Sequence, residues 1–139
     1  MDPDEAWLDT AERGAQWLIN VRDGGKETAQ LSHDHWLLYA LNDRPDPLYL
    51  EHSMRITEAI ISSQHRDPPF PDWLGGYYRP PRSTPTATRS EGLMAAYKLA
   101  RDNGMVEEAA RIMEAVRYGV AFQLQTQFTP ERVMYLDNP

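Results

Sequence analysis

A repeat that spans two helices at once is the feature that most constrains the fold of this chain. Residues 49–60 (YLEHSMRITEAI) return 56 positions later at 105–116 as MVEEAARIMEAV. The identical pairs are Glu51/Glu107, Arg55/Arg111, Ile56/Ile112, Glu58/Glu114 and Ala59/Ala115, and a neighbouring helix adds Leu37/Leu93 and Ala40/Ala96 at the same offset. A third copy of this frame begins at Trp7-Leu8-Asp9, with Arg13. Repeats of two helices stack as helical hairpins. We therefore expect a single all-α domain over residues 1–139, built from antiparallel αα-hairpins.

Five helices are predicted from apolar periodicity and from start and stop signals. The expected ranges are about 3–22, 32–42, 47–65, 85–103 and 106–128, and no segment alternates as a β-strand would. Asp2-Pro3 and Asp46-Pro47 mark two helix starts, while Asp23-Gly24-Gly25, Gly104 and Pro130 mark ends. Trp7, Trp17 and Tyr49 are interpreted as packing residues between helices. Apolar residues of the last helix that fall on one face are Val106, Ala109, Met113, Val116, Val120 and Leu124.

The connections between these helices are unequal in length. The second and third helices, and the fourth and fifth, are joined by short turns, Asp43-Arg44-Pro45 and Asn103-Gly104. The segment from Arg66 to about Thr84 is much longer, and a loop of that length inside a compact repeat is often functional. In an antiparallel array, the long loops and the starts of the second and fourth helices lie at one end. That end is the expected functional surface.

Composition and charge exclude several classes of protein. The net charge is −7, and the 14 Lys and Arg residues are dispersed, which argues against a nucleic-acid or anionic-membrane surface. The chain has no Cys, so disulfides, thiolate chemistry and Cys-based zinc sites are ruled out. No apolar run reaches membrane length, and the acidic start does not resemble a signal peptide. A cytoplasmic location is expected.

Two triplets at the starts of the apolar inner helices carry the candidate chemistry. The 56-residue offset superposes His33-Asp34-His35 on Arg89-Ser90-Glu91. His and Glu can act as general acids or bases, and Arg can hold a carboxylate or phosphate with two hydrogen bonds. Each has a structural alternative. Thr88 to Glu91 reads as a capping box, and His35 as a hydrogen-bonded residue of an inner helix. The two histidines are two residues apart and diverge on a helix, so no shared metal is expected.

The long loop is rich in aromatic and Arg side chains. Trp73, Tyr77 and Tyr78 can stack on the apolar faces of sugar rings, and Arg79 and Arg82 follow them. Gly75-Gly76 allows a tight bend there. The Glu51/Arg55 and Glu107/Arg111 pairs are interpreted as solvated i,i+4 ion pairs.

Residues 82–97 (RSTPTATRSEGLMAAY) resemble an inner helix from the C-terminal region of D-glucuronyl C5-epimerase-like proteins. Alternating outer and inner helices, with long loops at one end, also resemble part of an (α/α)6 toroid, a fold of many glycosidases, sugar epimerases and polysaccharide lyases. The resemblance implies a pocket at the end lined by inner-helix starts and long loops. It places near that pocket the candidates Tyr77, Tyr78, Arg79, Arg82, Arg89, Glu91, His33 and His35.

The resemblance leads to a functional expectation. Five helices are fewer than the roughly twelve of a closed toroid, so we expect a fragment of a larger carbohydrate-active protein acting on acidic sugars, without a cofactor. The reaction would be epimerisation by proton abstraction beside a uronate carboxylate, or hydrolysis of a glycosidic bond. The residues expected to act as general acids or bases are Glu91, Tyr77, Tyr78 and His35. The residues expected to bind substrate are Arg79, Arg82, Arg89, Trp73 and His33. Uncovered helical faces predict self-association.

A different class of function is a helical-repeat interaction domain without catalytic activity. Tetratricopeptide-type modules have units of about 34 residues. The offsets of 42 and 56 seen here are longer, and a long aromatic loop is foreign to such modules. Whether the chain is an enzyme stays open at this level.

Overall fold

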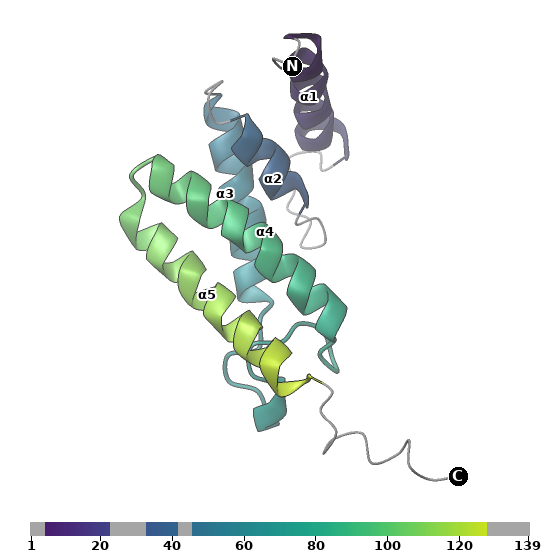
Figure 1. The fold of residues 1–139 in the computed structure, drawn as a ribbon, viewed down its shortest axis with the longest axis vertical. Helices are drawn as coiled ribbons and strands as arrows, with labels where there is room; N and C mark the ends of the chain where they lie inside the picture. Colours follow the sequence, from purple (N-terminus) through teal and green to yellow (C-terminus); the bar gives the residue numbers. More distant parts are fainter. Residues whose placement is uncertain (1–4, 23–32, 42–45, 128–139) are drawn as a thin grey trace, which may run out of the picture.

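The computed structural model describes residues 5–22, 33–41 and 46–127 of the chain (Figure 1). Most of these residues are helical and none forms a β-strand, so the all-α prediction is confirmed for them. The elements are α1 (Glu5–Trp17), a π-helical turn η1 (Leu18–Arg22), α2 (His33–Ala40), α3 (Pro47–Ser62), a 3-10 turn η2 (Pro71–Trp73), α4 (Ser83–Asp102) and α5 (Val106–Gln125). The expected signals at 2–3, 23–25, 43–45 and 130 lie outside the described residues, as does the side chain of His33.

The start of α3 follows its predicted cap. The Asp46 side chain accepts a hydrogen bond from the Leu48 amide at 2.9 Å, and Pro47 occupies the first helical position. The start of α4 differs from the prediction. This helix begins at Ser83, and Pro85 is accommodated in its first turn, where no amide donor is needed. Glu91 consequently lies well inside α4, and the capping-box interpretation of Thr88 to Glu91 is wrong.

Helices α4 and α5 lie side by side and antiparallel, joined by the tight turn at Asn103-Gly104 (Figure 1). Gly104 has a φ of +74°, a conformation that glycine adopts without steric cost. The main core lies between this pair and α3, and the loop residue Tyr77 is part of it. Its fully buried large side chains are Ile56, Ile60, Tyr77, Leu93 and Ile112.

Contacts between the other helices set their relative direction. Lys98 of α4 lies over the rings of Trp36 and Tyr39, at 5.0 and 5.7 Å from their centroids, and the Tyr39 hydroxyl donates to Asp102 at 3.4 Å. Helix α2 therefore runs in the same direction as α4. Glu58 of α3 pairs with Arg111 of α5 at 2.6 Å. The residues that follow α3 lie further along α5, so α3 and α5 also run in the same direction.

Helix α1 lies at one edge of the described structure (Figure 1). Its small apolar face, Ala15 with Ile19 of η1, packs with Leu38, Leu41 and Tyr49. Tyr49 is buried as predicted, but Trp7 and Trp17 are exposed, so the prediction that they pack between helices is wrong. The reason is geometric: Ala15 occupies the side of α1 that faces the core, and the two Trp side chains are on the other side.

Helix α5 forms the opposite edge, and its predicted apolar face is divided. Ala109 and Val116 are buried, whereas Val106, Val120 and Leu124 are exposed. None of the helices in the described residues is long and apolar enough to cross a membrane.

Candidate functional site

The long loop between α3 and α4 is closed at its base by backbone hydrogen bonds. The His65 amide donates to the Gly76 carbonyl at 3.0 Å, and the Gly75 amide donates to the His65 carbonyl at 2.8 Å. The buried Gln64 side-chain amide donates to the carbonyls of Gly75 and Ala115, both at 3.0 Å. These bonds hold the loop against α5.

Tyr77 anchors the same loop to α4. Its amide donates to the Thr86 hydroxyl at 3.3 Å, and its carbonyl accepts from the Arg82 amide at 3.1 Å. The Tyr77 ring is fully buried in the main core. Its hydroxyl has no hydrogen-bond partner among the described residues. Burial raises the pKa of this phenol well above its usual value, although the nearby Arg89 charge acts in the opposite direction.

Arg89 is the residue that joins the loop to the inner helix. Its guanidinium lies 4.7 Å from the ring centroids of both Tyr77 and Tyr78, and only 7% of the residue is exposed. A cation over an aromatic face is attracted by the negative potential of the ring, more strongly where water is excluded. Tyr78 is 43% exposed and has a φ of +76°, which is rare for a side chain larger than glycine. Arg89 thus supports the ring of a solvent-facing Tyr.

Further aromatic side chains gather at η2. The Trp73 ring lies 5.3 Å from His65 and 5.1 Å from Phe70, measured between centroids, and Phe70 is largely exposed. Arg66 lies over the Tyr118 ring at 4.0 Å and pairs with Glu114 at 3.7 Å. Sequence reasoning did not select His65, Arg66 or Phe70. Their place within the same aromatic and basic loop was the signal that could have found them.

The remaining loop and helix candidates are accessible. Arg79 and Arg82 are exposed, and so is Glu91 on α4. A carboxylate on α4 and two guanidinium groups on the loop are therefore available to solvent. The roles predicted for these side chains stay predictions.

His35 lies in a different environment. It is fully buried, and its Nε2 is 3.1 Å from the Thr57 hydroxyl of α3. The contacts of α2 with α4 fall on Lys98 and Asp102, beyond Glu91 along the helix. The sequence offset that superposed His33-Asp34-His35 on Arg89-Ser90-Glu91 is thus not the register in which the two helices touch. Asp34 instead pairs with Arg22.

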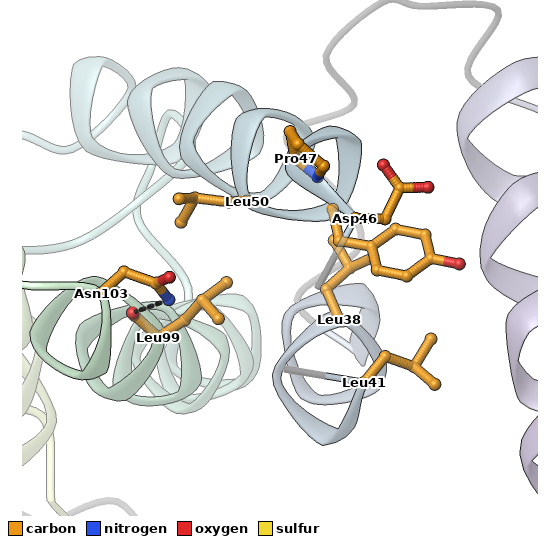
Figure 2. Close-up of a pocket in the computed structure, with 8 residues that line it drawn as sticks. Leu38, Leu41, Asp46, Pro47, Leu50, Leu99 and Asn103 are labelled. Carbon is orange, nitrogen blue, oxygen red and sulfur yellow. Dashed lines mark hydrogen bonds between the residues drawn. The ribbon is translucent and has the colours of Figure 1, made fainter. Parts of the chain in front are cut away.

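A cavity of about 260 Å³ lies at the other end of α4 (Figure 2). Leu38, Leu41, Leu50 and Leu99 give it a mostly apolar lining, and Asp46 and Asn103 add polar groups. The Asn103 side-chain amide donates to the Leu99 carbonyl at 2.8 Å, so this donor is already used. None of the predicted site residues lines this cavity.

A wider open groove of about 680 Å³ runs between α3 and α5. Leu50, Met54 and Met105 contribute apolar surface to it, and Arg55, Glu58 and Arg111 contribute charge. Neither this groove nor the cavity reaches the loop that carries Tyr77 and Tyr78.

Within the described residues, His, Asp and Glu side chains do not gather in groups of three that could hold a metal ion. Comparison with protein-family models, with curated proteins and with solved structures gives no match. The resemblance to the epimerase-like inner helix therefore stays a prediction made from residues 82–97.

Proposed function

We propose that this chain forms part of a carbohydrate-active α/α-toroid protein, and that its loop 64–82 with the start of α4 binds an acidic sugar. The observation that carries the proposal is the Tyr77-Arg89-Tyr78 stack. A buried guanidinium in contact with both rings holds the exposed Tyr78 in place, which lowers the entropy lost when a sugar ring stacks on it. The parallel pairs α2/α4 and α3/α5 agree with a toroid segment.

The charges beside Tyr78 favour an anionic ligand. Arg79 and Arg82 are exposed on the same loop, and a guanidinium matches a carboxylate with two parallel hydrogen bonds. Trp73 adds a second aromatic surface beside Phe70. A uronic acid presents both an apolar ring face and a carboxylate, so it fits aromatic and Arg side chains together.

The solvent exposure of the predicted residues decides which roles we propose for them. Glu91 and Tyr78 are exposed and could exchange protons with a bound sugar, in epimerisation or in glycosidic hydrolysis. Tyr77 and His35 are fully buried, so we assign them positioning roles. The exposed Arg79 and Arg82, with the half-buried Trp73, would contact the ligand, and Arg89 would support Tyr78. His33 would act at the start of α2.

Isothermal titration calorimetry with uronate oligosaccharides and with neutral oligosaccharides of equal length tests the proposal. We expect binding of the acidic series alone, and at least tenfold weaker binding after Tyr78→Ala or the double change Arg79→Gln and Arg82→Gln. Arg101→Gln, an exposed Arg at the far end of α4, is the matched control and should bind as the wild type does. Equal binding by all variants, or no binding by the wild type, would refute the assignment.

The groove between α3 and α5 favours a second candidate, a helical-repeat domain that binds protein segments without catalysis. Its apolar surface with Arg and Glu at the margins suits an amphipathic helix. The two candidates differ in the residues they use. Met105→Glu should leave uronate binding unchanged if the first is correct, whereas capture of a helical peptide that Met105→Glu abolishes would support the second.

A further inference from the structure

The edge helices α1 and α5 each expose a face to solvent. The sequence repeat aligns these two faces with the two sides of a contact that already exists within the chain. The contact is the one between α3 and α5. On the α3 side it involves Leu50, Met54 and Glu58, and on the α5 side it involves Met105, Glu108 and Arg111. Arg111 of α5 reaches Glu58 of α3 at 2.6 Å, so the Arg of one repeat pairs with the Glu of the preceding repeat.

In the sequence repeat, the α3 residues of this contact correspond to residues on the exposed face of α5. Shifting Leu50, Met54 and Glu58 by 56 positions gives Val106, Ala110 and Glu114. All three are exposed, Val106 by 76%, and Leu124 extends the same side of α5 with 66% exposure. Helix α5 thus presents to solvent the equivalent of the surface with which α3 receives its neighbour.

In the sequence repeat, the α5 residues of the contact correspond to residues of α1. The third copy of the frame aligns Met105, Glu108 and Arg111 with Trp7, Thr10 and Arg13. All three are exposed, Trp7 by 73%. Trp7, Thr10, Gly14 and Trp17 follow the heptad spacing of a helix-packing stripe. Helix α1 thus presents to solvent the equivalent of the surface with which α5 meets α3.

The contact from α1 to α3 falls on the same sides of the repeat as the contact from α3 to α5. Gln16, which the repeat aligns with Glu58, lies 3.5 Å from the hydroxyl of Tyr49, which the repeat aligns with Met105. In the contact between α3 and α5, Glu58 instead meets Arg111, which the repeat aligns with Arg55. The pairs α1/α3 and α3/α5 therefore use the same sides of the repeat, in different registers. The unused faces at the two edges carry opposite charges at Arg13 and Glu114.

We propose that α1 of a second copy docks on α5, with Trp7 against Val106 and Ala110 and with Arg13 paired to Glu114. The two surfaces differ, so the contact is head-to-tail and continues the array from one copy to the next. Such an interface builds a ring if the rotation closes, and otherwise an open chain. Glu114 also pairs with Arg66 at the base of the proposed sugar-binding loop, at 3.7 Å. The variants Arg13→Glu and Val106→Asp leave that pair intact, so they separate a failure of this docking from a failure of sugar binding.

Sedimentation velocity over a wide range of protein concentration tests the docking. The weight-average sedimentation coefficient of the wild type is expected to increase with protein concentration. Arg13→Glu and Glu114→Arg place like charges across the interface, and each should weaken association about tenfold, because a lost exposed pair and a new repulsion each contribute up to about fivefold. Val106→Asp should weaken it about thirtyfold by burying a lone carboxylate. An Asp in the first turn of α5 suits the helix, so this variant keeps its fold.

Mixing the two charge variants supplies the sharpest readout. The carboxylate introduced by Arg13→Glu in one variant can pair with the guanidinium introduced by Glu114→Arg in the other. At the next contact along the array, the native Arg13 of the second variant meets the native Glu114 of the first. The mixture should therefore associate as the wild type does, while each variant alone does not.

The control is Arg101→Glu, which alters an exposed charge on α4, outside both edge helices, and should leave association unchanged. A wild type that stays monomeric at the highest concentration, or association that persists in both single variants, would overturn the proposal.

Discussion

Removing one oxygen atom from the core should stabilise this protein. Tyr77 is fully buried, and its hydroxyl has no hydrogen-bond partner within the described residues. A buried polar group without a partner costs about 1–3 kcal/mol, because it gives up its hydrogen bonds to water on folding. Tyr77→Phe removes that cost and keeps the ring, so no large cavity is created. We expect the free energy of unfolding to rise by about 1 kcal/mol and the melting temperature by about 3 °C.

The pH dependence of the same variant supplies a second readout. Burial raises the pKa of Tyr77 in the folded state above the ordinary value of 10.0. Below that pH, the phenol is neutral in both the folded and the unfolded state. As the pH rises further, the unfolded state releases a proton that the folded state retains, so the wild type loses stability. Tyr77→Phe lacks this group, and its advantage over the wild type should grow in the alkaline range.

Urea denaturation followed by circular dichroism measures both effects, at neutral pH and at a series of alkaline values. Tyr78→Phe is the matched control, since that hydroxyl is on an exposed side chain and its removal should change stability by less than about 0.5 kcal/mol. A loss of more than about 1 kcal/mol in Tyr77→Phe at neutral pH would show that the hydroxyl is hydrogen-bonded, and would refute the reasoning.

Two further substitutions test the loop and the inner helix. Gly75→Ala should lower the free energy of unfolding by at least about 3 kcal/mol, because the φ of +85° strains an alanine and its Cβ would overlap with the Tyr118 carbonyl. Gly104→Ala, at a φ of +74° with open space around it, should lower the free energy of unfolding by about 1 kcal/mol. Equal losses of stability in thermal melts would contradict this reasoning. Thr57→Val should cost about 1–3 kcal/mol by removing the hydroxyl partner of the buried His35 Nε2, and unchanged urea unfolding would mean that this contact contributes nothing.

Much of the local structure follows from short-range signals. Asp46-Pro47 begins α3 because a carboxylate caps free amides and proline needs no donor there. Gly104 ends the α4/α5 turn because it accepts a positive φ. The predicted start of α4, at about residue 85, is close to the observed start at Ser83. The capping-box interpretation of Thr88 to Glu91 fails, because this sequence has capping chemistry but lies within a continuous helix. A capping sequence acts only where the chain actually leaves the helix.

The candidate site was only partly accessible to sequence reasoning. The aromatic and Arg composition of the loop is visible in the sequence, and the structure places Tyr77, Tyr78 and Arg89 in contact. That Tyr77 faces the core while Tyr78 faces solvent could not be predicted, because the turn at Tyr78 depends on bonds to Gln64, Thr86 and α5. The interpretation of His35 as a hydrogen-bonded residue of an inner helix is confirmed. Its partner Thr57 could not be predicted, because Thr57 is on a helix that the repeat offset does not relate to His35.

The sequence by itself determined that the described chain is helical, roughly where its helices begin and end, and that α3 and α5 share one frame, because these properties depend on neighbours along the chain. Only the tertiary structure decided which faces are buried. Trp7, Val106 and Leu124 are apolar yet exposed, while Arg89 and His35 are polar yet buried. Burial depends on which helices pack together and in what register, and that register differs from the sequence offset because helices touch where their side chains fit.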